Sequence, residues 1–245
     1  MKMTPSIFIL FTIYAVVNAY FPVFFRGMGY TVTQVGFLLA ILEIAGLILP
    51  VILAPFIDKT QSHGLFFLMF AFILVVFPIP LFSIHGFAVT AVCIAFYAIG
   101  FKGAIPVSDS MVSNALNEHQ DWYGRVRVAG SIGFVIMSLI MQRFVSFAIT
   151  QRSIILWSLI PAVILFITVL CIPGVFKKTN HRGPSVVASK ILHSGSFSGF
   201  KPSFWFGIGF IFLMMFGQVA FTRFLSIYVD ESLHSNAFGF LWALS

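Results

Sequence analysis

The stretch Pro5–Phe25, PSIFILFTIYAVVNAYFPVFF, contains no charged side chain. A helix needs about 20 apolar residues to cross about 30 Å of hydrocarbon, and this stretch has that length. A cleaved signal peptide is the alternative, because Lys2 precedes the apolar run and Val17–Ala19 resembles a cleavage site. The run continues to Phe25, which favours an uncleaved first membrane span.

The overall composition indicates that lipid is the main solvent of this chain. Of its 245 residues, 60% are hydrophobic and 9% are charged, whereas soluble domains carry about 25% charged residues. So few charges could not cover a water-soluble globule. The formal net charge of +7 comes from Lys and Arg placed between apolar runs. That distribution is typical of cytoplasmic loops and not of a nucleic-acid-binding surface.

Further apolar runs predict an all-α membrane protein, since open sheet edges cannot be satisfied in lipid. The same length criterion predicts six more spans, at Thr33–Ile57, Leu65–Ser83, Phe87–Ser108, Val128–Ala148, Ser153–Ile172 and Phe204–Tyr228. Another apolar run begins at Asn236, but the chain stops at Ser245 before it could span. We therefore expect a natural truncation or a fragment, which ends early in an eighth helix.

The positive charges of the loops predict the orientation in the membrane. With a cytoplasmic N-terminus, the outer loops contain only Arg26 and Arg152. The inner segments then contain Lys2, Lys59, Arg125, Arg127, Lys177, Lys178, Arg182, Lys190 and Lys201. We therefore expect a multi-pass protein of the cell (inner) membrane with its N-terminus in the cytoplasm.

A basic segment rich in Ser and Gly separates the sixth span from the seventh, and it is bracketed by Pro173 and Pro202. This composition is typical of a linker, within which Val186–Leu192 could form a short surface helix. We expect an N-terminal half of six spans at 1–172, a cytoplasmic linker at 173–203 and the beginning of a second half at 204–245.

A short internal repeat supports this division. The segment Gly36–Ala40 (GFLLA) recurs as Gly239–Ala243 (GFLWA), at an offset of 203 residues that also brings the starts of the first and seventh spans to within four residues of each other. Parallel repeats of six spans are typical of major facilitator transporters, and two such repeats would need about 400 residues. Chance recurrence in a sequence rich in Phe and Leu is the alternative.

Two segments resemble a known family: Tyr20–Gly36 (YFPVFFRGMGYTVTQVG), and Pro106–Asp109 (PVSD) followed by Tyr123–Phe134 (YGRVRVAGSIGF). They are similar to the branch of the major facilitator superfamily that includes bacterial 3-phenylpropionate transporters and, more distantly, nucleoside and lactose proton symporters. The resemblance extends over essentially the whole chain. It implies twelve spans, alternating access and proton-coupled uptake, of which this chain holds the first six-helix half, helix 7 and the start of helix 8.

The loop after the second span departs from the pattern of the wider superfamily. It keeps an acidic residue and its basic neighbour, Asp58 and Lys59, but lacks both glycines of the motif. A gating role for Asp58 and Lys59 is the expectation that the resemblance supports.

Glu43 lies ten residues into the second span, close to the bilayer midplane. Charged residues inside spans are costly and usually functional, and a desolvated carboxyl suits reversible protonation. We predict that Glu43 couples transport to protons or contacts the substrate. A packing role, with the carboxyl paired inside the bundle, is the alternative.

Tyr14 and Asn18 are four residues apart and share one face of the first span. Gln218 has a comparable depth in the seventh span, and the resemblance implies that both spans line the central cavity. We predict that these three residues contact the substrate. Ordinary polar contacts between helices, worth about 0.6 kcal/mol each, are the alternative.

Three further cations lie within predicted spans: Lys102, Arg143 and Arg223. Arg223 is close enough to a span end to reach the headgroups. Lys102 and Arg143 are deeper, and if both face inward they favour a carboxylate substrate over a neutral sugar.

Arg125 and Arg127 flank the inner mouth of the fifth span, near Asp109 and Asp121. Ion pairs between these arginines and the two aspartates could lock the outward-open state and break on opening. The resemblance favours such a gating role for Arg127. Arg125 fits ordinary positive-inside charge better.

No motif for enzymatic or metal chemistry stands out. All six histidines, including His63, fall in predicted loops, and Cys93 and Cys171 lie in apolar runs as expected of buried thiols without a disulfide. We find no phosphate loop or nucleophile motif. We therefore expect no cofactor, no bound metal, no enzymatic activity and no nucleic-acid partner.

The function predicted is secondary active transport, with proton-coupled uptake of a small organic solute by a chain that is monomeric when full length. An aromatic or other organic acid is the favoured solute. A receptor or scaffold on a transporter fold is the alternative, and a membrane-embedded enzyme or a channel fits less well. Because alternating access requires both six-span halves, we expect the 245-residue chain alone not to transport.

Overall fold

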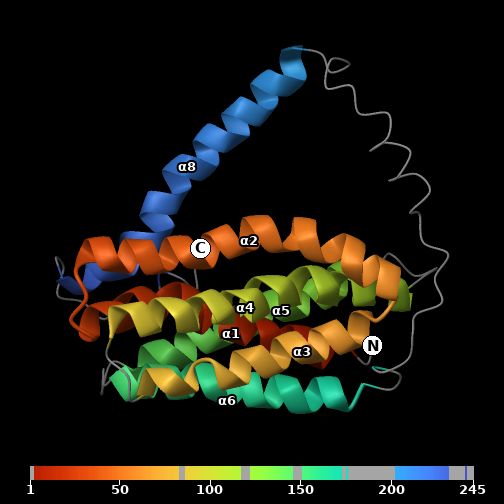
Figure 1. Cartoon of the computed structure of the whole chain (residues 1–245), viewed down its shortest axis with the longest axis horizontal. Helices are drawn as coiled ribbons and strands as arrows, with labels where there is room; N and C mark the ends of the chain where they lie inside the picture. The colour runs from red at the N-terminus through yellow and green to blue at the C-terminus, as the bar shows by residue number, and fades with distance from the viewer. Residues whose placement is uncertain are drawn as a thin grey trace.

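The structure, a computed structural model, describes residues 3–82, 86–116, 122–145, 151–172, 175, 202–231 and 241. Within these residues it contains seven α-helices and a short 3₁₀ helix, η1 (Figure 1). The helices are α1 (Thr4–Gly27), α2 (Val32–Thr60), α3 (His63–Val76), α4 (Phe87–Leu116), α5 (Trp122–Val145), α6 (Gln151–Leu170) and α8 (Pro202–Glu231), with η1 at Ile79–Phe82. The described part of the fold is therefore all-α, as the composition predicts.

Four helical segments are long and apolar enough to cross a membrane: Thr4–Gly27, His63–Leu81, Phe87–Leu116 and Trp122–Phe144. The remaining helices α2, α6 and α8 each contain a shorter apolar stretch among the described residues. Every span predicted from the sequence coincides with one of these helices in the same order. The predicted linker and the start of the eighth span lie almost wholly outside the described residues.

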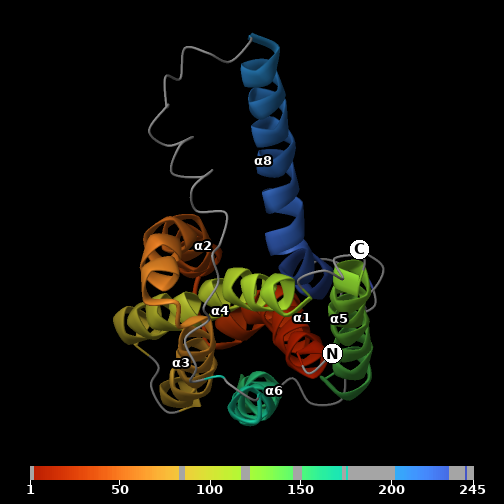
Figure 2. The ribbon, with the colours of Figure 1, turned by 90° about the vertical axis from the view of Figure 1, so that its right-hand side faces the viewer.

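Helix α1 forms the centre of the bundle. It packs against α5, α6 and α8, and the view along the bundle shows it surrounded by α3, α4, α5 and α6 (Figure 2). Most of its residues are buried, polar Ser6 and Thr12 among them. The first apolar segment is thus an integral part of the folded core.

Small residues allow two helix pairs to approach closely. On α5, a Cβ atom added at Gly133 would lie 2.5 Å from the carbonyl oxygen of Phe8 on α1. On α4, a Cβ at Gly103 would lie 2.7 Å from the ring of Phe70 on α3. Such close backbone contact is a common means of helix association in membranes, where burial of apolar surface supplies little driving force.

Helix α8 extends away from the other helices (Figure 1). Its first part is largely exposed, and it presents apolar side chains between Phe204 and Phe216. Its last turns meet the bundle, where Ile227 and Val229 are buried and Phe224 lies opposite Gly36 of α2. The end of α8 is therefore the part that joins the core formed by the other helices.

The helix bounds differ from the predicted spans at three points. Helix α3 ends at Val76 and continues only as η1, because Pro78 and Pro80 cannot supply helical amide hydrogens. Helices α4 and α5 run past the predicted limits at Ser108 and Val128, because backbone hydrogen bonding continues beyond the apolar segment. Asp109, Arg125 and Arg127 consequently lie on helices.

Two predictions about single side chains were wrong. His63 is the first residue of α3 and is buried, with 6% of its surface exposed, because the helix begins two residues before the apolar run. Cys171 is exposed, since α6 ends at Leu170, whereas Cys93 is buried as predicted. Both thiols are free.

The close contact between α1 and α5 yields a stability prediction. We expect Gly133→Ala to lower the free energy of unfolding by about 1–3 kcal/mol, because its methyl group would meet the rigid backbone of Phe8. Gly124→Ala on the same helix is the matched control, because nothing lies within 4 Å of a Cβ atom there. Denaturant titration in detergent micelles measures both. Equal stability of the two variants would contradict the packing described.

Candidate functional site

An ion pair joins the middle of α2 to the middle of α4. The Lys102 ammonium Nζ donates to both carboxylate oxygens of Glu43, at 3.1 Å to Oε1 and 2.9 Å to Oε2. The side chain of Lys102 is 15% exposed and that of Glu43 is 39% exposed. Each group therefore compensates the charge of the other, and the Glu43 side chain remains partly accessible.

Features of the local sequence position Glu43 and Lys102 opposite each other. Thr31 and Gln34 form a capping box that fixes the start of α2, and Glu43 follows about 17 Å along the helix axis. Gly46 lies one turn after Glu43, where an added Cβ atom would stand 3.0 Å from Cδ of Lys102. The missing side chain at Gly46 makes room for the lysine stem to cross from α4 to the carboxylate.

An aromatic wall lies beside the ion pair. Tyr14 of α1 donates its hydroxyl hydrogen to the carbonyl oxygen of Phe101, at 2.7 Å. Its ring stacks on the Phe101 ring with a centroid separation of 3.9 Å. The Phe101 ring also lies 5.9 Å from Tyr97 and 5.5 Å from the Lys102 ammonium. The Lys102 ammonium thus lies beside a stacked pair of rings, of which Phe101 is fully buried and Tyr14 is half-buried.

The other residues predicted to bind substrate are spread over three helices. Asn18 is half-buried on α1, one turn beyond Tyr14. Gln218 is exposed on α8, and Arg143 is exposed in the last turn of α5. Helix α5 packs chiefly against α1, whereas the ion pair lies between α2 and α4. Of the residues predicted to bind substrate, Lys102 and Glu43 form an ion pair with each other.

A second ion pair ties α4 to α5. Arg127 Nη1 donates to both carboxylate oxygens of Asp109, at 2.8 Å to each, and its guanidinium lies 5.8 Å from the ring centroid of Phe11. Arg125 instead stacks on Trp122 at 4.5 Å and is exposed. The two neighbouring arginines thus have different partners.

The loop predicted to gate with this pair is described only in part. Lys59 is exposed in the last turn of α2, and the side chain of Asp58 lies outside the described residues. Among the described residues, no group of three or more His, Cys, Asp or Glu side chains could hold a metal ion.

Comparison with known proteins identifies the family of the chain. The MFS_1 like family matches residues 1–245, the whole chain. No curated protein sequence matches significantly. The crystal structure of the nucleoside transporter NupG superposes with a TM-score of 0.73 at 15% identity, over 98% of this chain and 62% of NupG. A point mutant of NupG gives a TM-score of 0.72 at 15% identity, over 94% of this chain and 57% of that one.

At 15% identity, the likeness to NupG demonstrates the fold alone. The chain spans 62% of the length of NupG. Both the family and the structural neighbours are membrane transporters and not enzymes. The described helices, the apolar composition and the match over the full sequence agree: the chain belongs to the MFS_1 like family of the major facilitator superfamily.

Proposed function

We propose that this chain is part of a secondary transporter in which Glu43 and Lys102 couple the uptake of an organic anion to the uptake of a proton. The observation that carries the proposal is the ion pair between α2 and α4, with Nζ–Oε2 at 2.9 Å. An intramembrane ion pair is costly to build and usually marks an ion or substrate pathway. The transporter fold of the family supports the same assignment.

The proposed coupling is an exchange of partners at Lys102. A solute carboxylate takes the place of the Glu43 carboxylate on the ammonium group, and the released Glu43 accepts a proton. Before the exchange the site contains one positive and one negative side chain. Afterwards it contains the lysine cation, the solute anion and a neutral Glu43. The net charge of the site is unchanged, so neither the proton nor the anion has to enter the membrane interior alone.

The aromatic wall favours solutes that carry a ring. The stacked Tyr14 and Phe101 rings lie next to the ammonium group, and aromatic faces prefer stacked or edge-on contacts with other rings. An aromatic acid would place its carboxylate on Lys102 and its ring against the half-buried Tyr14, behind which the fully buried Phe101 ring is stacked. Asn18, Gln218 and Arg143 would contribute further contacts in the complete cavity, as the sequence predicts.

The inner ion pair is proposed to act as a gating element. Asp109 lies seven residues after Lys102, on the same face of α4, and Arg127 holds it against α5. Breakage of this pair would free the inner end of α4 when the solute site changes state. Asp58 and Lys59 are proposed to join this inner gate, with the N-terminus in the cytoplasm and the protein in the cell (inner) membrane.

Transport in vesicles tests the coupling. Vesicles from cells that express the complete gene encoding this chain should take up 4-hydroxybenzoate in response to a pH gradient, but not to a potassium-valinomycin voltage, because the exchange is electroneutral. Lys102→Met should lower the rate at least about tenfold through loss of the cation that binds the anion. Glu43→Gln should abolish uptake driven by the pH gradient. Exchange of labelled solute outside the vesicles for unlabelled solute inside should persist.

The matched control is Glu231→Gln, the same substitution at the last residue of α8, which should behave as wild type. Protein-free vesicles give the passive background, and uridine and lactose replace the acid as neutral solutes. Uptake of the neutral solutes that does not need Lys102 would refute the anion assignment. Saturable binding without flux would favour a receptor or scaffold.

The gating role of the pair Asp109–Arg127 is tested by measuring both the uptake rate and the solute affinity of each variant. Asp109→Asn and Arg127→Gln should slow uptake about tenfold while solute affinity changes little, because they alter an opening step and not the binding site. The charge swap Asp109→Arg with Arg127→Asp should restore part of the rate. Arg125→Gln is the control, since Arg125 stacks on Trp122 instead. Equal losses at Arg125 and Arg127 would exclude a specific gate.

A further inference from the structure

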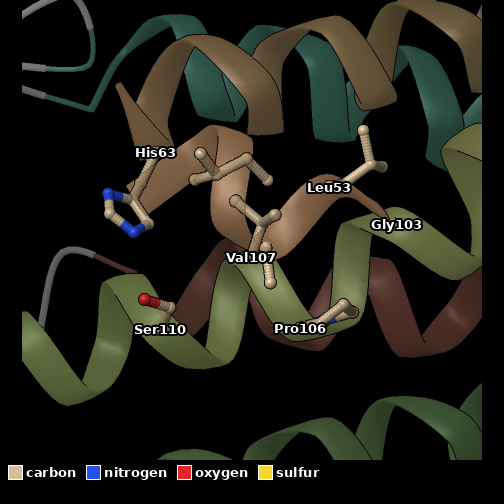
Figure 3. A pocket seen from close by; sticks show the side chains of 8 residues that line it. Leu53, His63, Gly103, Pro106, Val107 and Ser110 are labelled. Carbon is tan, nitrogen blue, oxygen red and sulfur yellow. The ribbon is translucent and has the colours of Figure 1, made fainter. Parts of the chain in front are cut away.

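A cleft between α2, α3 and α4 plays no part in the coupling scheme above. Its volume is about 160 Å³. Most of its described wall is apolar, and among the lining side chains that the structure describes the polar ones are His63 and Ser110. The lining residues are Leu53, Ala54, Ile57, His63, Gly103, Pro106, Val107 and Ser110. Figure 3 shows His63 and Ser110 at one end of the cleft, with Leu53 and Gly103 toward the other.

The cleft opens on the side of the helices that carries the first ion pair. Ala54 follows Glu43 by eleven residues, or about three helical turns, and Pro106 follows Lys102 by four residues, so each lies on the same helix face as its predecessor. Ala54 and Pro106 are exposed at the mouth, whereas Ile57 and Val107 are buried in the wall. The cleft and the ion pair therefore border the same faces of α2 and α4.

We propose that the cleft is a separate binding site for a neutral, ring-sized molecule that carries one hydrogen-bonding group, such as a phenol. An apolar cavity of about 150 Å³ in another protein is large enough for benzene, and this cleft is of similar size. Because the cleft is polar at one end and apolar elsewhere, it matches a ligand with one polar group and an apolar body. None of the eight lining residues is Lys or Arg, so a full negative charge would be poorly compensated there.

The polar end is well separated from the proposed coupling site. Ser110 lies eight residues beyond Lys102, about 12 Å along α4. His63 is 6% exposed, so its imidazole is largely shielded from solvent. The hydroxyl of Ser110 and the imidazole of His63 can each act as donor or acceptor, which suits a phenolic hydroxyl that is both. A solute carboxylate held at Lys102 would therefore not occupy the polar end of the cleft.

Fluorine NMR of 4-fluorophenol with the 245-residue chain in lipid nanodiscs tests the proposal, because saturable binding is separable from partition into lipid. Ala54→Leu should weaken saturable binding at least tenfold by filling the mouth of the cleft. Ala40→Leu, the same change at an exposed position of α2, should bind as wild type. Ser110→Ala should weaken 4-fluorophenol about fivefold, the effect of one hydrogen bond, and leave fluorobenzene unchanged.

Lys102→Met separates this site from the proposed transport site, because it should leave 4-fluorophenol binding unchanged. If Lys102→Met abolishes that binding while Ala54→Leu does not, the phenol occupies the transport site and the proposal is wrong. Binding in detergent but not in nanodiscs would assign the cleft to a lipid chain and also overturn it. The absence of any saturable component in both media would do the same.

Discussion

A charge in the hydrocarbon of a membrane requires a compensating charge close by, and the contact between Lys102 and Glu43 meets this requirement. Substitution of either side chain by a neutral one would leave the other charge uncompensated between α2 and α4. The contact therefore constrains the register of these helices as well as their chemistry. Gly46 is part of the same constraint, because a side chain there would meet the stem of Lys102. Tyr14 extends it to α1 by its hydrogen bond to the carbonyl of Phe101.

The bundle supports this contact through close packing around α1. Gly133 lets α5 lie against the backbone of Phe8, and Gly103 lets α4 lie against Phe70 of α3. Helix α4 is then held on three sides, by α3, by the ion pair to α2 and by Asp109–Arg127 to α5. A change of partner at Lys102 that shifts α4 would therefore also alter the contact between Asp109 and Arg127. This continuity connects the proposed coupling step to the proposed gate.

Much of the helical layout could be predicted from the sequence, because membrane thickness sets the length of an apolar run. The stretch Pro5–Phe25 matches α1 closely. Helix ends were less predictable: α4 continues to Leu116 because hydrogen bonds, unlike hydropathy, do not stop at the edge of the hydrocarbon. His63 was assigned to a loop because it precedes the apolar run, although it begins α3 and is buried.

Candidate residues could be named from their depth, but their partners could not. Glu43 and Lys102 are 59 positions apart, and no local pattern indicates which distant charge faces which. Asp109 and Arg127 were both named as gating residues because they flank one short segment, but which aspartate pairs with which arginine comes from the structure. The cleft beside His63 had no sequence signal, since it depends on the packing of three helices.

The most direct test of partner exchange observes the protonation of Glu43 itself. Infrared difference spectra of the 245-residue chain in nanodiscs, recorded upon addition of 4-hydroxybenzoate, should show a new carboxylic acid C=O band from the protein. The band should be absent in Glu43→Gln and retained in Glu231→Gln. Isotope-labelled solute separates its bands from those of the protein. Solute binding without such a band, or a band that survives Glu43→Gln, would contradict the exchange of partners at Lys102.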